Sequence, residues 1–280
     1  MSAFSAEWLD LREPVDHRSR NKTLARALAQ HFDGWHRLTV VDLGCGTGSN
    51  LRATAPLLGP DQHWTLVDRD PSLLKAAVGR LTAWADTADD SQGTLALAKG
   101  RQRLKVAFRQ ADLAADLEAA LGPAADLVTA AALFDLVSAA FMAKFATALA
   151  ARRSAFYTVL TYNGEQGWTP AHAADSAMRD AFHAHQRRDK GFGAAAGPAA
   201  PDLLRQGLAG VHYRVSEADS AWRLGLEDAA LVGDLAQGFA AAVAETDAVG
   251  SATLAAWRGL DRAGAVVGHT DTLALPPLPE

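Results

Sequence analysis

The feature that most constrains the fold is a glycine-rich turn that follows an apolar segment. Residues 38–43 predict a buried strand, and glycine then occupies positions 44, 46 and 48. Glycine adopts positive φ at little cost and lets a backbone lie against a ligand with no Cβ in the way. In doubly wound α/β folds, ligands bind beyond the carboxyl ends of the strands. The sequence therefore predicts a ligand-binding turn at the edge of a parallel sheet.

The spacing and charge of the turn discriminate between ligands. A dinucleotide-binding turn reads G-x-G-x-x-G and carries a pyrophosphate on a helix N-terminus. Here the third glycine comes one residue earlier, and Asp42 would repel a pyrophosphate. An acid at this place suits a ligand that carries an ammonium group and no phosphate, and S-adenosyl-L-methionine is such a ligand.

The string D-L-G-C-G-T-G at 42–48 resembles motif I (D/E-x-G-x-G-x-G) of class I S-adenosylmethionine-dependent methyltransferases. The resemblance implies S-adenosyl-L-methionine as cofactor, with contacts from the following residues: Asp42, Gly44, Cys45, Gly46 and Gly48. Residues 8–20 and the string H-Q-R-R-D-K-G-F-G at 185–193 also resemble bacterial methyltransferases that have no assigned substrate. A glycine turn with only a structural role is the alternative.

Two acidic positions further along fit the same family pattern. Asp68 ends the next apolar run, where the resemblance implies a carboxylate that accepts hydrogen bonds from the ribose hydroxyls, and we include its neighbour Arg69. Asp112 and Leu113 resemble the residues that contact the adenine ring. The alternative for Asp68 is a turn aspartate, and the alternative for Asp112 is the N-cap of a helix.

The methionine end of the cofactor has candidates on two segments. Residues 126–136, with Thr129, resemble the family's fourth motif, which lies beneath the methionine chain; the absence there of N-P-P-Y or D-P-P-Y disfavours methylation of nucleic-acid base amines. A methionine carboxylate needs a cation or N–H donors. We assign Arg18 and Arg20 to this role and Arg12 to the substrate, and surface ion pairs are the alternative for each arginine.

The alternation of strand and helix patterns predicts an α/β, doubly wound, mostly parallel seven-stranded sheet with helices on both faces. We expect an N-terminal helical cap divided at Pro14 and an insertion after strand five. The expected strands lie near 38–43, 64–68, 104–108, 126–129, 155–160, 211–215 and 266–275. We expect one domain over 1–280, composed of a cap (1–34), a cofactor-binding core (35–161), a substrate and lid insertion (162–210) and C-terminal strands and helices (211–280).

Catalytic residues are expected above the glycine turn, because an acceptor hydroxyl or ammonium group must lose a proton to a base. The candidates for this base are His185, Tyr162 and Asp135, and the candidates for substrate contact are His183, Lys190 and Phe192 beside Arg12. On a helix, His183 and His185 would point to different sides, which disfavours a metal pair, and no metal is expected. The string 185–193 is predicted to form a substrate lid; an exposed helix end that runs into a surface loop is the alternative.

Composition favours a small-molecule acceptor. The net charge is −5 and only short basic clusters occur, whereas nucleic-acid binders carry a basic stripe. No apolar run has membrane-spanning length, and the N-terminal residues lack a secretory pattern, so a cytoplasmic location is expected. An RNA-modifying methyltransferase, a non-catalytic cofactor-binding partner and an aminopropyl-transferring relative remain open as alternatives.

Overall fold

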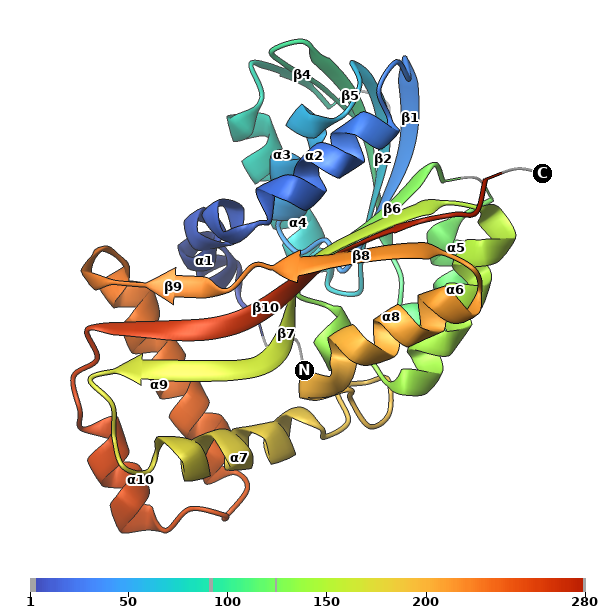
Figure 1. Ribbon diagram of the computed structural model, residues 1–280. Helices are drawn as coiled ribbons and strands as arrows, with labels where there is room; N and C mark the ends of the chain where they lie inside the picture. The colour runs from blue at the N-terminus through green and yellow to red at the C-terminus, as the bar shows by residue number, and fades with distance from the viewer. Residues whose placement is uncertain (1–3, 91–92, 124, 279–280) are drawn as a thin grey trace.

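The computed structural model describes residues 4–90, 93–123 and 125–278, so the first three residues of the expected cap lie outside it (Figure 1). One sheet runs through the molecule in the order β3-β4-β5-β2-β1-β6-β7-β10-β8, and β9 pairs with β10. The strands are β1 (Arg37–Leu43), β2 (Asp61–Asp68), β3 (Thr87–Asp89), β4 (Leu95–Lys99), β5 (Gln102–Gln110), β6 (Leu127–Ala131), β7 (Ala155–Thr169), β8 (Arg214–Asp219), β9 (Trp222–Leu224) and β10 (Gly264–Leu275).

The predicted α/β architecture is confirmed. Strands β5, β2, β1, β6 and β7 are parallel neighbours, and β10 runs antiparallel to β7 and β8. The hairpin of β3 and β4 and the short β9 add to the seven predicted strands. The sixth strand was placed too early: residues 211–213 end the preceding helix, where Val211 and Tyr213 donate backbone hydrogen bonds to Leu208.

Helices cover both faces of the sheet. They are α1 (Ala6–Ser19), α2 (Lys22–His31), α3 (Ser49–Thr54), α4 (Pro71–Trp84), α5 (Leu113–Leu121), α6 (Ala139–Arg152), α7 (Asp175–Gln186), α8 (Ala200–Gly210), α9 (Ala229–Ala244) and α10 (Ser251–Arg258). Apolar side chains of α2, α3 and α4 pack in one core, and those of α5, α6 and α8 pack in a second core on the opposite face. The two cores bury alternate residues of the central strands, as a sheet covered on both faces requires.

The expected division of the N-terminal cap at Pro14 is wrong. Pro14 lies inside α1, where its missing N–H leaves the carbonyl of the exposed residue Asp10 open to water. The break falls at Asn21, whose side chain accepts hydrogen bonds from the N–H groups of Thr23 and Leu24 and so caps α2. The Asn21 N–H donates to the buried carboxylate of Asp271 on β10 at 2.8 Å, which fixes the break against the sheet.

Strand β7 is longer than predicted. It continues through residues 162–169, which pair with β10, so the insertion after it begins beyond Thr169. These residues, the facing part of β10 and β9 form what we call the ribbon: residues 161–169, 222–224 and 264–270. Figure 1 shows the ribbon extending past the body of the sheet, with α7, α9 and α10 beside it. A cluster of three large side chains, Trp168, Phe239 and Trp257, joins the ribbon to these helices.

Candidate functional site

The glycine turn has the backbone geometry that its sequence predicts. Gly44, Gly46 and Gly48 have φ of +63°, +53° and +78°, a region that residues with a Cβ rarely adopt. The Cys45 N–H donates to the carbonyl of Val67 at 3.0 Å, which holds the turn against the end of β2. The Cys45 thiol is buried, and this burial raises its pKa, so the thiol stays protonated. The side chain therefore serves to fill space in the turn.

Asp68 is joined directly to the turn. Its Oδ2 accepts a hydrogen bond from the Gly46 N–H at 2.9 Å, and its Oδ1 accepts one from the Asp70 N–H at 2.9 Å. Each carboxylate oxygen can accept a second hydrogen bond. The carboxyl group of Asp68 therefore braces the turn and retains capacity to bind ligand hydroxyls.

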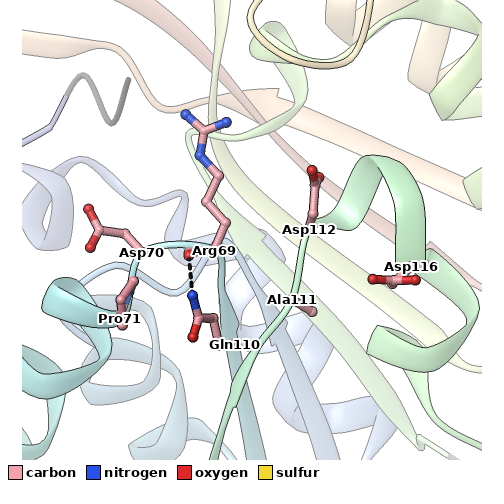
Figure 2. Close-up of a pocket in the computed structure, with 7 residues that line it drawn as sticks. All are labelled: Arg69, Asp70, Pro71, Gln110, Ala111, Asp112 and Asp116. Atoms are coloured by element: carbon pink, nitrogen blue, oxygen red, sulfur yellow. Dashed lines mark hydrogen bonds between the residues drawn. The ribbon is translucent and has the colours of Figure 1, made fainter.

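A cleft of about 600 Å³ opens beside Asp68, between the carboxyl ends of β2 and β5. Figure 2 shows its lining residues: Arg69, Asp70, Pro71, Gln110, Ala111, Asp112 and Asp116. The Gln110 side chain donates to the Arg69 carbonyl at 3.2 Å and ties the two strand ends together. The carboxyl group of Asp112 caps α5 by accepting from the Ala114 N–H at 2.9 Å, so the N-cap alternative is confirmed for a residue that also lines the cleft. Leu113 is buried in the core below.

Asp42 and Thr129 lie beneath the turn. Asp42 is fully buried, and its Oδ1 accepts a hydrogen bond from the Asn50 side chain at 2.6 Å. The same amide donates to the Thr129 hydroxyl at 3.0 Å. The Asp42 Oδ2 atom has no hydrogen-bond partner among the described residues. Burial raises the pKa of Asp42 to about 7.

The three N-terminal arginines all have protein partners. The Arg20 side chain donates to Asn50 Oδ1 at 2.8 Å and to the Thr54 hydroxyl at 3.1 Å, above Asp42. Arg18 pairs with Asp228, and Arg12 pairs with Asp16 at 2.8 Å. Arg18 forms a surface ion pair, whereas the pair of Arg12 with Asp16 is buried. Contact of Arg18 or Arg20 with a methionine carboxylate, and of Arg12 with a substrate, stays a prediction.

Helix α1 covers the glycine turn. The Leu9 Cδ1 atom lies 3.0 Å from the position that a Cβ on Gly46 would occupy. Glu13 of the same helix forms an ion pair with Arg52 of α3, and Arg52 also donates to the Thr47 carbonyl at 2.8 Å. The cap is thus held to the turn at Gly46 and, through Arg52, at Thr47.

A second group of polar side chains, which we call the Asp135 cluster, lies where the ribbon leaves the sheet. It comprises Arg12, Asp16, Asp135, Tyr162, Trp222 and His269, all of which are at least nine-tenths buried. The Tyr162 backbone N–H faces Asp135 and helps to lower its pKa, and Asp135 Oδ1 has no hydrogen-bond partner among the described residues. Burial raises the pKa of Asp135 to about 6, an effect that the charge of Arg12 opposes.

The other members of the Asp135 cluster surround Arg12 and His269. The Arg12 guanidinium lies 4.9 Å from the centre of the Trp222 ring, and the Trp222 indole N–H donates to Asp16 at 3.1 Å. The His269 ring lies 5.2 Å from that of Trp222, and its Nδ1 has no partner among the described residues. Burial lowers the pKa of His269 to about 3, which keeps the ring neutral. Asp16, Trp222 and His269 could not be predicted as site residues from the sequence, because no motif surrounds them.

The two histidines of α7 face different surroundings, as their spacing predicts. His183 Nε2 is 3.0 Å from the Tyr162 hydroxyl, beside the Asp135 cluster. His185 instead contacts Glu245 at 3.1 Å, near the end of α9, and its role as a base stays a prediction. Burial lowers the pKa of His183 and raises that of Tyr162, so both side chains are neutral near pH 7.

The glycine-containing loop after α7 reaches the carboxyl ends of the parallel strands, beside Arg69. Asp189 Oδ1 accepts hydrogen bonds from the Gly191 and Gly193 N–H groups, at 2.7 and 3.0 Å, which gives the loop a fixed turn. A Cβ on Gly191 would lie 3.3 Å from the Arg69 guanidinium. Phe192 is half-buried, and its ring packs on Phe141 beside the second core, with centroids 4.8 Å apart; its contact with a substrate stays a prediction.

Lys190, in the same loop, is half-buried and lies near His185, whose pKa its charge helps to lower. Its contact with a substrate stays a prediction. In the described part of the chain, no group of three or more His, Cys, Asp or Glu side chains is arranged to hold a metal ion. Among the described residues, no helix has the length and apolar character needed to cross a bilayer.

Comparison with solved structures identifies the fold. A cyclopropane-fatty-acyl-phospholipid synthase-like protein from Lactobacillus casei is 18% identical with a TM-score of 0.54, over 95% of this chain and 92% of that protein. A candidate methyltransferase from Bacillus halodurans is 12% identical with a TM-score of 0.52, over 91% of this chain and 100% of that protein. The YcgJ protein from Bacillus subtilis is 11% identical with a TM-score of 0.53, over 94% and 100%.

No protein-family model matches the chain, and no curated protein matches its sequence. At identities this low, the likeness to solved structures shows the fold alone. The chain has the class I, Rossmann-like fold of S-adenosylmethionine-dependent methyltransferases.

Proposed function

We propose that this chain is an S-adenosylmethionine-dependent methyltransferase that acts on a small-molecule acceptor. One observation carries the proposal: a turn of positive-φ glycines is hydrogen-bonded to Asp68, and the adjoining cleft is bordered by Asp112. The fold supports it at a general level.

The residues present fit the nucleoside half of the cofactor. Asp68 stands where ribose hydroxyls would find acceptors, and the cleft of about 600 Å³ has the size of a small-ligand site. Asp112 and the backbone of Leu113 would contact the adenine ring at the far wall. The unpartnered, buried Oδ2 of Asp42 suits a site that receives an ammonium group, which would favour the ionised carboxylate.

The bound cofactor supplies a methyl group on a sulfonium centre. The residues of this chain would position the acceptor and exclude water, since alignment is the main requirement for an activated leaving group. Asp135 and the Tyr162–His183 pair are the groups placed to hold or move the acceptor proton. A buried cluster beneath a helical cap favours a small acceptor over a nucleic acid.

Calorimetric titration of S-adenosylhomocysteine tests the proposal. We expect the wild-type chain to bind it, and Asp68→Asn to weaken binding by about 10- to 150-fold through loss of a charge-assisted hydrogen bond, about 1.5–3 kcal/mol. The matched control is Asp86→Asn. Asp86 is an exposed acid that pairs with Lys99 away from the cleft, so this variant should bind S-adenosylhomocysteine like wild type. Absence of binding to the wild-type chain would reject the proposed function.

A further inference from the structure

The Asp135 cluster contains one carboxylate whose charge is left without a full partner. The cation that acts on Asp135 is Arg12, but Arg12 gives two of its N–H groups to Asp16, at 2.8 and 3.2 Å. Charges on Arg12 and Asp16 therefore cancel. His183, His269 and Tyr162 are neutral near pH 7, because burial lowers the pKa of each histidine and raises that of the tyrosine. Arg179 is a further cation, but its charge acts on Tyr162 and His183, and Arg12 is the cation that acts on Asp135. Within its six residues, the cluster therefore has a net negative charge when Asp135 is ionised.

Two buried polar atoms of the cluster have no partner among the described residues: Asp135 Oδ1 and His269 Nδ1. We place them in one site because the Tyr162 ring lies 6.3 Å from the His269 ring, centroid to centroid, and because the charge of Arg12 lowers the pKa of both Asp135 and His269. Buried polar atoms are nearly always hydrogen-bonded in folded proteins. The orphaned pair therefore indicates a polar ligand.

The position of the cluster relates it to methyl transfer. Asp135 follows the carboxyl end of β6, and the nearby Leu133 packs on the glycine turn, with its Cδ1 3.3 Å from the Cβ position of Gly44. The carboxyl group of Asp135 is thus two residues from a side chain that contacts the turn. An acceptor held by Asp135 would lie beside the glycine turn, under α1 and against the ribbon.

We propose that the methyl acceptor is a small amine, bound as an ammonium group by Asp135 Oδ1, with His269 Nδ1 as a second acceptor and the rings of Tyr162 and Trp222 as walls. This inference rests on the proposed function. The ammonium group passes one proton to the Asp135 carboxylate, and the neutral nitrogen then forms a bond to the methyl carbon. The carbon–sulfur bond breaks, its electron pair stays on sulfur, and the product is the N-methylated ammonium ion.

Other acceptor classes fit the cluster less well. A carboxylate acceptor would add a second negative charge to a buried site, which is strongly unfavourable. A hydroxyl acceptor could hydrogen-bond to Asp135 but would leave its charge unbalanced. An ammonium group both balances the charge and occupies the orphaned atoms, and it is attracted to aromatic faces.

Binding of matched probes tests this inference without turnover. Two series of probes are titrated calorimetrically at pH 7.5, with and without saturating S-adenosylhomocysteine. The first is butylamine, butanol and butyrate, and the second is benzylamine, benzyl alcohol and benzoate. We expect at least one amine to bind about tenfold or more tightly than its alcohol, and the acids not to bind. Asp135→Asn should remove this preference and leave S-adenosylhomocysteine affinity within twofold, because asparagine keeps the shape of the side chain. Asp234→Asn, an exposed acid on α9, is the matched control and should behave like wild type.

The outcomes separate this inference from the proposed function. Failure of wild type to bind S-adenosylhomocysteine rejects the proposed function, whatever the probes do. Binding of S-adenosylhomocysteine without a preference for amines overturns only the inference, and that arm needs no variant to fold. A loss of S-adenosylhomocysteine affinity in Asp135→Asn would assign Asp135 to the cofactor's own ammonium group and would also overturn it.

Discussion

The two halves of the candidate site are built in different ways. In the nucleoside half, Asp68 ends a strand, Gly46 and Asp112 lie within three residues of a strand end, and neighbouring strands bring them together. In the Asp135 cluster, the side chains come from helix α1, from the turn that follows β6, and from strands β7, β9 and β10. They are therefore spread along the sequence from Arg12 to His269. A site at parallel strand ends is encoded locally, whereas a site at the base of the ribbon depends on the whole topology.

This difference has an energetic consequence. The nucleoside half is an open cleft whose lining residues are mostly exposed, so substitutions there should change ligand affinity and leave the fold largely unaffected. The Asp135 cluster is buried, and its ion pair and hydrogen bonds also join α1 to the ribbon. Substitutions in the cluster should therefore change stability as well as binding. The predictions below test where this division holds.

The largest effect is expected from Asp16→Ala. It removes the partner of the buried Arg12 and the acceptor of the Trp222 indole, and breaking a buried pair from one side costs about 3–5 kcal/mol of unfolding free energy. The control is Asp10→Ala on the same helix, which loses only a surface pair with Arg80 and should cost less than about 1 kcal/mol. Urea unfolding of both variants gives the comparison.

A loss below about 1 kcal/mol in Asp16→Ala would contradict the division. It would mean that Arg12 pairs with Asp135 once Asp16 is gone. Asp135 would then have an available protein cation, and its carboxylate would not need a ligand cation.

Asp42, beneath the glycine turn, departs from this division because it is fully buried. Its pKa rises from 3.8 to about 7, so between these values the folded chain holds a proton that the unfolded chain has released. The unfolding free energy should therefore fall as the pH rises from about 4 to about 7, by at most about 4 kcal/mol from this group. Asp42→Asn should remove this part of the pH dependence, since its Oδ1 can still accept from Asn50.

Urea unfolding at several pH values between 4.5 and 8 checks this expectation. The stability advantage of Asp42→Asn over wild type should grow with pH and level off above about 7. Asp135 acts in the same direction over a narrower range, because its pKa is raised only to about 6. Parallel curves for wild type and Asp42→Asn would show that the Asp42 carboxyl group is not held neutral by burial.

The nucleoside half could be predicted from the sequence because its signals are short. Glycines at 44, 46 and 48 need positive φ, and an acid at the end of a strand falls at the edge of the sheet. The first five predicted strands and the last one follow from apolar runs, whereas β8 is a mostly polar strand that such runs do not identify. The N-cap role of Asp112 could be read from its position before an apolar helix.

The rest depends on contacts that periodicity does not reveal. Val211 and Tyr213 resemble a strand, but they pack beneath α8 instead. The break between α1 and α2 depends on the cap at Asn21 and on a contact with Asp271, far along the chain. Phe192 resembles a ligand contact in a polar string, and the string does not reveal that its ring packs beside the second core.

The choice between the two histidines of α7 shows the same limit. The spacing predicts that His183 and His185 diverge, but not which of them faces the ribbon. That depends on the rotation of α7, which is set by Met178 and Phe182 packing in the first core. His183 is brought to Tyr162, and His185 is brought to Glu245.

The smallest effect is expected from a substitution of Leu9. Its helix, α1, belongs to both halves of the site: Arg12 and Asp16 of α1 are part of the Asp135 cluster, and Leu9 of α1 covers the glycine turn. Leu9 is half-buried, so Leu9→Ala should lower the unfolding free energy by about 1–2 kcal/mol. Its contact is with the turn itself, so S-adenosylhomocysteine affinity should change by less than about threefold. Calorimetric titration of the variant beside wild type measures this. A loss above about tenfold would make α1 a wall of the nucleoside half, and the two halves would then share one binding surface.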